Sequence, residues 1–94
     1  MMENEPAYVD GNAAAGVFSE VFALEVTAAV GICSGCGATG PIAQAHVYLR
    51  APGMVVRCAH CEQPLMRLVK APGRLWIDLR GLVSLELSLP ETDG

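Results

Sequence analysis

Four cysteines are the residues of this chain whose type and spacing point most directly to chemistry. They form two Cys-x2-Cys pairs, at 33–36 and 58–61. Two intervening residues let a tight turn aim both thiolates at one point, and two such turns supply four sulfurs at tetrahedral angles, with Zn–S distances of about 2.3 Å. The spacing therefore predicts one structural zinc ion per chain, with four ligands: Cys33, Cys36, Cys58 and Cys61.

The same sulfurs leave other chemistries open. Four thiolates also hold a single iron ion, and the cysteine pattern alone does not separate the two metals. Disulfides are disfavoured, because the acidic residues 1–10 do not resemble a secretory signal and cytoplasm keeps thiols reduced. A thioredoxin-like dithiol is also disfavoured, because the first pair does not lie between a strand and a helix in a βαβ pattern.

No group of residues predicts catalysis. Four protein ligands leave no position for water on the metal, and no serine stands at a recognisable motif spacing from a histidine and a carboxylate. The glycines at 35, 37 and 40 belong to the first cysteine turn, not to a phosphate loop. His46 could be a surface residue, a hydrogen-bond donor to a thiolate or a substitute ligand, and its place on the wet side of a predicted strand favours the surface. We expect a protein that is not an enzyme.

Length and composition limit the class of protein. The chain has 94 residues, of which 52% are hydrophobic and 17% charged, so it is one small domain and not a disordered segment. A domain of this size leaves roughly 40% of its unfolded-chain surface exposed, so a metal would add useful folding free energy. The uncharged run 26–49 is interrupted by glycines, a proline and polar residues, so no membrane span is expected. We expect a cytoplasmic protein.

Hydrophobic periodicity predicts the elements that position the cysteines. A helix is expected at about 12–24, capped by Asp10 or Asn12, and a strand at 25–32 leads into the first cysteine turn. Apolar and polar residues alternate in 43–50, 74–80 and 82–89, which is typical of half-buried antiparallel strands. Two Ala-Pro-Gly segments, at 51–53 and 71–73, predict type II turns.

These elements predict a small, mostly-β (α+β) zinc ribbon. Its single domain is expected to span residues 10–89, with an N-terminal helix, an antiparallel β-sheet and two zinc knuckles that form the metal site within 33–61. A β extension at 65–89 is expected to continue the same sheet. Residues 1–9 and 90–94 are expected to be flexible ends.

The cysteine turns resemble the knuckles of zinc-ribbon proteins in general. More of the chain resembles a small uncharacterised family of bacterial zinc-ribbon proteins, typical of actinomycetes. This resemblance implies metal binding and brings no activity, and it motivates an alternative role as an accessory to redox enzymes. The residues that carry it are the segment 10–13, Glu20, Val21 and Phe22, Thr27, the stretch 33–40, the first Ala-Pro-Gly turn, Cys58 with Cys61, and the segment 76–81.

The charges are unevenly distributed along the chain. The net charge is −4, which disfavours general affinity for nucleic acid. All six basic residues lie within 50–80, where only Glu62 and Asp78 oppose them, so this segment carries +4. An exposed sheet face there could bind a partner, although an ordinary solvated face explains the pattern as well. The candidate residues for this face are Tyr48, Arg50, Arg74, Trp76 and Arg80.

The sequence therefore predicts a non-catalytic zinc-binding protein that acts as a protein-interaction or accessory module. One alternative is a rubredoxin-like iron electron carrier or an accessory to a redox enzyme, and a second is a nucleic-acid-binding zinc ribbon. The predicted partner is another protein, with a redox enzyme as one candidate. A homo-oligomer is also plausible, because the amphipathic strand near the end of the chain, 83–89, would invite pairing if one of its edges stayed open.

Overall fold

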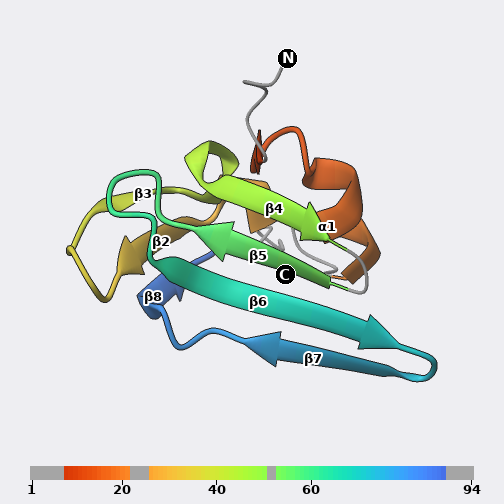
Figure 1. Ribbon diagram of the computed structural model, residues 1–94. Helices are drawn as coiled ribbons and strands as arrows, with labels where there is room; N and C mark the ends of the chain where they lie inside the picture. Colours follow the sequence, from red (N-terminus) through yellow and green to blue (C-terminus); the bar gives the residue numbers. More distant parts are fainter. Residues whose placement is uncertain (1–7, 22–25, 51–52, 89–94) are drawn as a thin grey trace, which may run out of the picture.

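Two antiparallel β-sheets organise the chain, as Figure 1 shows for the computed structural model, which describes residues 8–21, 26–50 and 53–88. The larger sheet has five strands in the spatial order β1 (Val9–Asp10), β4 (His46–Arg50), β5 (Gly53–Arg57), β6 (Pro64–Ala71) and β7 (Arg74–Asp78). The smaller sheet has the order β3 (Thr39–Pro41), β2 (Val30–Cys33) and β8 (Leu82–Glu86). The protein is therefore mostly antiparallel β, as expected.

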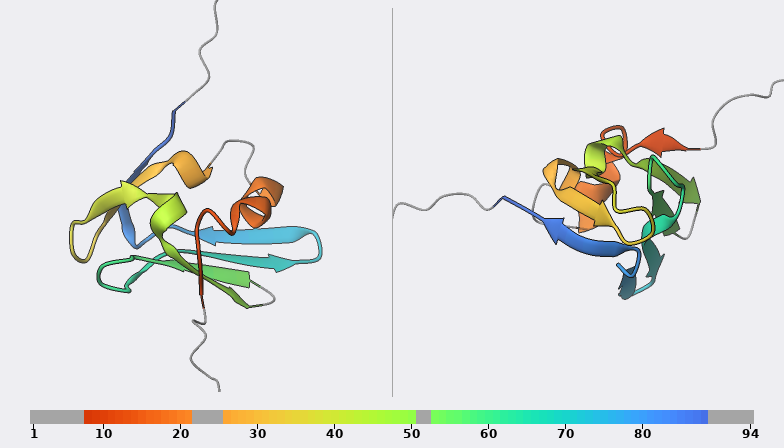
Figure 2. Two further views of the ribbon diagram at one scale, coloured as in Figure 1. Left: turned by 90° about the horizontal axis from the view of Figure 1, so that it is seen from above. Right: turned by 90° about the vertical axis from the view of Figure 1, so that its left-hand side faces the viewer.

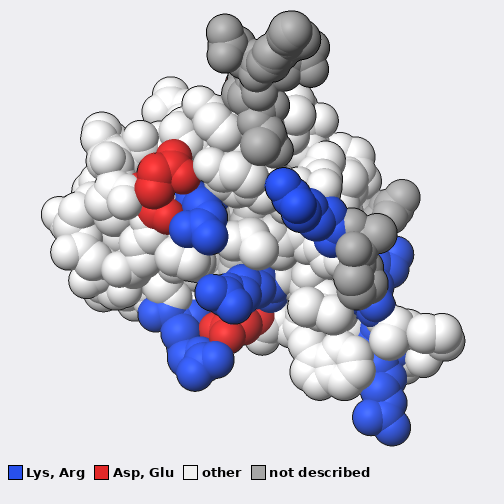
Figure 3. Space-filling view, viewed as in Figure 1, with Lys and Arg blue, Asp and Glu red and all other residues white. Residues whose placement is uncertain are grey.

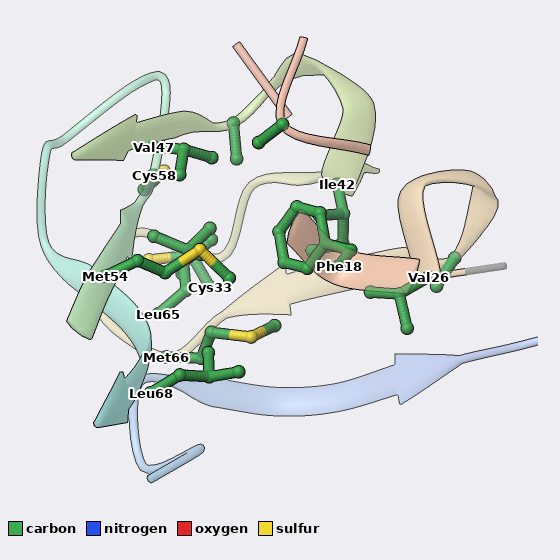
Figure 4. Close-up of a cluster of buried hydrophobic side chains, with 14 residues drawn as sticks. Phe18, Val26, Cys33, Ile42, Val47, Met54, Cys58, Leu65, Met66 and Leu68 are labelled. Atoms are coloured by element: carbon green, nitrogen blue, oxygen red, sulfur yellow. The ribbon is translucent and has the colours of Figure 1, made fainter. Parts of the chain in front are cut away.

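The core lies between the larger sheet and a second layer formed by the smaller sheet and the short helices (Figures 2 and 4). Strand alternation sends every second side chain of the larger sheet inward, so that Val47, Val56 and Met66 are almost fully buried. From the other layer, Phe18 and Ile42 meet them. This apolar cluster also contains Cys33 and Cys58. Two of the four candidate metal ligands are therefore part of the core.

The helical segment begins later than the predicted residue 12. α1 spans Ala15–Val21, and Phe18 buries its ring from it. Ahead of it, the Oδ1 of Asp10 accepts a hydrogen bond of 2.7 Å from the N–H of Ala13. Asp10 therefore stabilises the turn that precedes α1. Residues 22–24 of the predicted helix lie outside the described residues.

The last strand departs from the prediction of one continuous sheet. β8 pairs with β2, whereas β7 pairs with β6. Gly81 lies at the crossing between the sheets: its N–H donates to Leu65 O at 3.2 Å, and its carbonyl O accepts from the N–H of Ser34 at 2.9 Å. A Cβ at Gly81 would lie 1.8 Å from Pro64 O. This close approach turns the chain away from the larger sheet, a long-range effect that strand periodicity does not encode.

Smaller differences concern the ends of the predicted strands. Residues 42–44 form a 3-10 helix (Ile42–Gln44), so β4 begins at His46 and not at residue 43. Likewise, Val26–Ala28 is a 3-10 helix, and β2 begins only at Val30. Val9, which was assigned to the flexible end, pairs with Val47 of β4. Residues 1–7 and 89–94 lie outside the described residues.

The two Ala-Pro-Gly segments behave differently. Gly73 has φ +75°, the left-handed value that the third position of a type II turn requires. Gly53 instead belongs to β5, where it lies opposite Arg50 and a Cβ would lie 2.2 Å from the carbonyl O of Leu68. This glycine therefore permits close strand approach, while residues 51–52 of the predicted turn lie outside the described residues. No helix in the described parts of the chain is long and apolar enough to cross a membrane.

Candidate metal centre

The two cysteine turns come from different sheets. The first follows β2 of the smaller sheet, and the second connects β5 to β6 of the larger sheet. In each turn the first cysteine is buried and the second is exposed, so Cys33 and Cys58 anchor in the core while Cys36 and Cys61 face solvent. The four sulfurs therefore meet where the two sheets approach each other, at one end of the core.

Two of the sulfur–sulfur separations match the edges of a tetrahedral ligand set. The Sγ atoms of Cys33 and Cys61 lie 3.7 Å apart, as do those of Cys36 and Cys58, and all four lie within 4.8 Å of one another. A tetrahedron with Zn–S bonds of about 2.3 Å has edges of about 3.8 Å. All four thiols are free, and the 3.7 Å separations are far longer than the disulfide bond of about 2.05 Å. The cluster could therefore hold one metal ion.

The two turns repeat the same hydrogen bonds. In each, the N–H two residues after the first cysteine donates to the sulfur of that cysteine at 3.3 Å. The N–H four residues after the first cysteine donates to its carbonyl O at 2.9 Å. The donors are Gly35 and Gly37 in the first turn and His60 and Glu62 in the second. Backbone N–H groups that point at sulfur favour the thiolate that binds a metal.

The N–H donors act on the pKa values of the thiols. Burial alone would raise the pKa of Cys33, but the backbone N–H groups of Cys36 and Gly35 and the neighbouring thiols donate to its sulfur and lower the pKa to about 7. At Cys61, the N–H of Gln63 acts to lower the pKa, but burial and the other three thiols outweigh it and raise the pKa to about 11. Metal binding by these thiols would therefore release protons.

Glu62 is a residue of the site that the sequence analysis missed. It follows Cys61 as Gly37 follows Cys36, and both adopt left-handed backbone, with φ +66° at Glu62 and +77° at Gly37. A glutamate is strained in this conformation, whereas a glycine is not. The signal was present, because the position after the second cysteine of the first turn is already a glycine.

The side chain of Glu62 gathers a polar cluster beside the metal-ligand candidates. Its carboxylate bonds to Nδ1 of His46 and accepts from the hydroxyl of Tyr48 at 2.9 Å. The ring of Tyr8 stacks on His46 at a centroid distance of 3.9 Å, and Arg57 donates to the carbonyl O of Glu62 at 2.8 Å. The hydrogen bond to His46 is the main cause that lowers the pKa of Glu62. His46 thus contacts Glu62, and it is not among the residues that cluster with the four sulfurs.

Most residues of the predicted binding face lie together on the outer side of the larger sheet. The strand registers place Arg50 and Trp76 in one row across the sheet, joined by Gly53 and Val69, while Tyr48 lies in the next row. Strand alternation puts Arg74 on the same side as Trp76. Figure 3 shows this side of the molecule: some Lys and Arg side chains border two small acidic areas, and others lie along the right-hand side away from them. The structure therefore brings these four residues to one face.

Two residues of the predicted face already form polar contacts within the chain. Tyr48 donates to Glu62, and Arg80 forms an ion pair of 2.7 Å with Asp78.

Between Tyr48 and Val69, the outer side of the larger sheet contains a groove of about 620 Å3 that the sequence alone did not show. Its lining combines apolar and basic side chains from β4, β5 and β6 with the acidic Glu62; the apolar and basic members include Arg50, Val55, Arg57, Arg67 and Val69.

The fold and the site together define a class: a small protein of mostly antiparallel strands whose four clustered cysteines could hold a metal ion. A family model described as "Family of unknown function (DUF6510)" matches residues 4–90, and the chain belongs to this family. No curated protein and no solved structure matches the chain. The family membership agrees with the resemblance to an uncharacterised family; it says nothing about zinc or about actinomycetes.

Proposed function

We propose that this protein is a non-catalytic zinc-binding module, a zinc ribbon in which one Zn2+ links the two cysteine turns. The observation that carries the proposal is the cluster of four free thiols, with Sγ–Sγ separations of 3.7 Å that suit tetrahedral coordination. When bound, zinc supplies a cross-link between the two sheets and contributes its binding free energy to folding. Since four protein sulfurs complete the coordination, no position remains for a reacting water, and we propose no enzymatic role.

The role of such a module is to present a surface to a protein partner. The groove on the outer side of the larger sheet supports this, because apolar Val55 and Val69 lie beside Arg50 and Arg67 in one depression. This lining suits a segment that combines apolar and acidic side chains. Nucleic acid is less favoured, because the ring of Tyr48 already contacts Tyr8 and Arg57 and so is less available for stacking on bases.

Elemental analysis of the purified protein tests the metal, in a medium that supplies both zinc and iron. We expect one zinc per chain and no visible absorption. One iron per chain, with a red colour and a reversible one-electron potential, would instead support the electron-carrier alternative, since the same thiolates hold iron.

The variant Cys36→Ser tests whether the thiols hold the metal. Cys36 is exposed, so its substitution removes a ligand without opening a cavity in the core. We expect loss of bound zinc and an insoluble or unfolded chain. Ser34→Ala, in the same turn, is the matched control and should keep one zinc per chain. A Cys36→Ser protein that folds normally by circular dichroism with no metal bound would contradict the proposal.

A further inference from the structure

The larger sheet ends in an open edge. β7 is its outermost strand and pairs with β6 alone within the described residues, and it forms the lower border of the sheet in Figure 1. In an antiparallel pair, every second residue of a strand directs its N–H and C=O away from its partner. An edge strand therefore offers a row of backbone groups to which a further strand can bind.

The side chains of this edge are unusually apolar for an exposed strand. Trp76 is 52% exposed, and its neighbours Leu75 and Ile77 are 39% and 43% exposed. Soluble proteins protect such edges with charges, prolines or a covering element, yet β7 has charges only at its two ends, Arg74 and Asp78. An exposed apolar edge of this kind favours pairing with a further strand.

The sequence of β7 is complementary to itself in the antiparallel direction. With two copies aligned so that Trp76 lies opposite Trp76, Arg74 of each copy lies opposite Asp78 of the other. Leu75 then lies opposite Ile77, so every pair across the interface is ionic, aromatic or apolar. Directly opposed residues share a face of the sheet, and Arg74, Trp76 and Asp78 occupy the outer face together. Both ends of the strand thus find the opposite charge through one twofold axis. Asp78, which Arg80 of its own chain already contacts at 2.7 Å, would then lie between two guanidinium groups.

We propose that β7 pairs with β7 of a second copy of this chain, so that two five-stranded sheets join into one continuous antiparallel sheet. The occupant is a second copy because the charge pattern selects it: an unrelated strand would have to reproduce the same order of charges. This inference does not rest on the proposed zinc. A contact between two five-residue strands is small, so the dimer is expected to dissociate on dilution.

The edge strand β8 of the smaller sheet is a weaker candidate for the same role. β8 ends the smaller sheet, and Val83 on it is 66% exposed. Self-pairing around Ser84 would place Leu82 opposite Glu86, which offers no charge complement. The oligomer predicted from the strand at 83–89 is therefore reassigned to β7.

Sedimentation and fluorescence of the purified protein, with its natural metal content, test the dimer. We expect a monomer–dimer equilibrium between about 1 μM and about 1 mM. Trp76 is the only tryptophan of the chain, so its emission should shift to longer wavelength as dilution exposes the ring. A monomer throughout this range would overturn the proposal.

Charge reversal tests the register. Arg74→Glu or Asp78→Lys alone places like charges opposite each other twice, which should raise the dimer dissociation constant by about 10- to 100-fold. An equal mixture of the two variants restores both opposite-charge pairs in the heterodimer and should dimerise as the unaltered protein does. Arg50→Glu is the matched control, because it makes the same charge change on the same face but on β4, away from the edge.

A milder pair of variants covers the case in which Asp78→Lys does not fold. Arg74→Gln and Asp78→Asn should each weaken the dimer, and the double variant should weaken it by less than the product of the two effects. Fully additive effects, or a dimer that survives Arg74→Glu and is lost in Val83→Lys, would overturn the proposed interface.

Discussion

Glu62 is the single residue whose conformation is least expected from its type. It adopts φ +66° at the position that Gly37 occupies in the other cysteine turn, and its carboxylate contacts His46 and Tyr48. The strained backbone of the turn and the polar cluster beside it therefore belong to the same residue. The contacts to β4 compensate for a strain that glycine would avoid.

Substitutions at Glu62 separate these two contributions. Glu62→Ala and Glu62→Gly both remove the carboxylate, but only glycine relieves the left-handed backbone. We therefore expect the glycine variant to be more stable than the alanine variant by about 1 kcal/mol, measured by urea unfolding of metal-loaded protein. At Gln44, which has no positive φ, the order should reverse. Equal stabilities at Glu62 would show that its backbone conformation carries no strain.

At the scale of elements, the decisive feature is the crossing between the sheets at Gly81. This glycine bonds to Leu65 of β6 and to Ser34 of the first cysteine turn. The same short segment thus directs β8 to the smaller sheet and holds the first cysteine turn near the larger one. The position of the four sulfurs depends on this crossing as well as on the local geometry of each turn.

Gly81→Ala should therefore be strongly destabilising. The added Cβ would lie 1.8 Å from Pro64 O and 2.7 Å from the Cα of Leu65, both backbone atoms that cannot move alone. We expect a loss of more than about 2 kcal/mol in the free energy of unfolding. Gly40→Ala is the control, because nothing lies within 4 Å of its Cβ, and it should change stability little. Similar effects of the two substitutions would contradict the crossing as described.

For the whole molecule, the proposed zinc joins two layers that share one small core. The buried apolar set is modest, and two of its members are the cysteines Cys33 and Cys58. A domain of 94 residues has a small margin of stability. Loss of a cross-link at the end of the core would therefore affect the entire fold and not only the two turns.

Metal removal should consequently lower the thermal unfolding midpoint by more than about 10 °C, because several kcal/mol of metal-binding free energy contribute to folding. The measurement is calorimetry before and after dialysis against a chelator, with elemental analysis to establish that the metal has left. Re-addition of zinc should restore the midpoint. An unchanged midpoint in verified metal-free protein would show that the site is not structural.

The sequence by itself determined the local features of this protein. The Cys-x2-Cys spacing predicted which four sulfurs could meet, because two intervening residues set the geometry of each turn whatever surrounds it. Alternation of apolar and polar residues predicted mostly antiparallel strands, since side chains of a strand point to opposite faces in turn. The turn predicted at Gly73 was found, with φ +75°, but the same tripeptide at 51–53 places its glycine in a strand, so the tripeptide alone does not decide the role of its glycine.

Only the tertiary structure decided which strands pair. The segment 82–86 has the same alternating pattern whether it joins β7 or β2, and the close approach at Gly81 selects β2. The contacts of Glu62 with His46 and Tyr48 likewise join residues far apart in sequence. The open edge of β7 is a consequence of the same choice, because β8 leaves the larger sheet. These strand pairings and side-chain contacts depend on which distant segments the folded chain brings close together. The periodicity of a single segment does not contain that information.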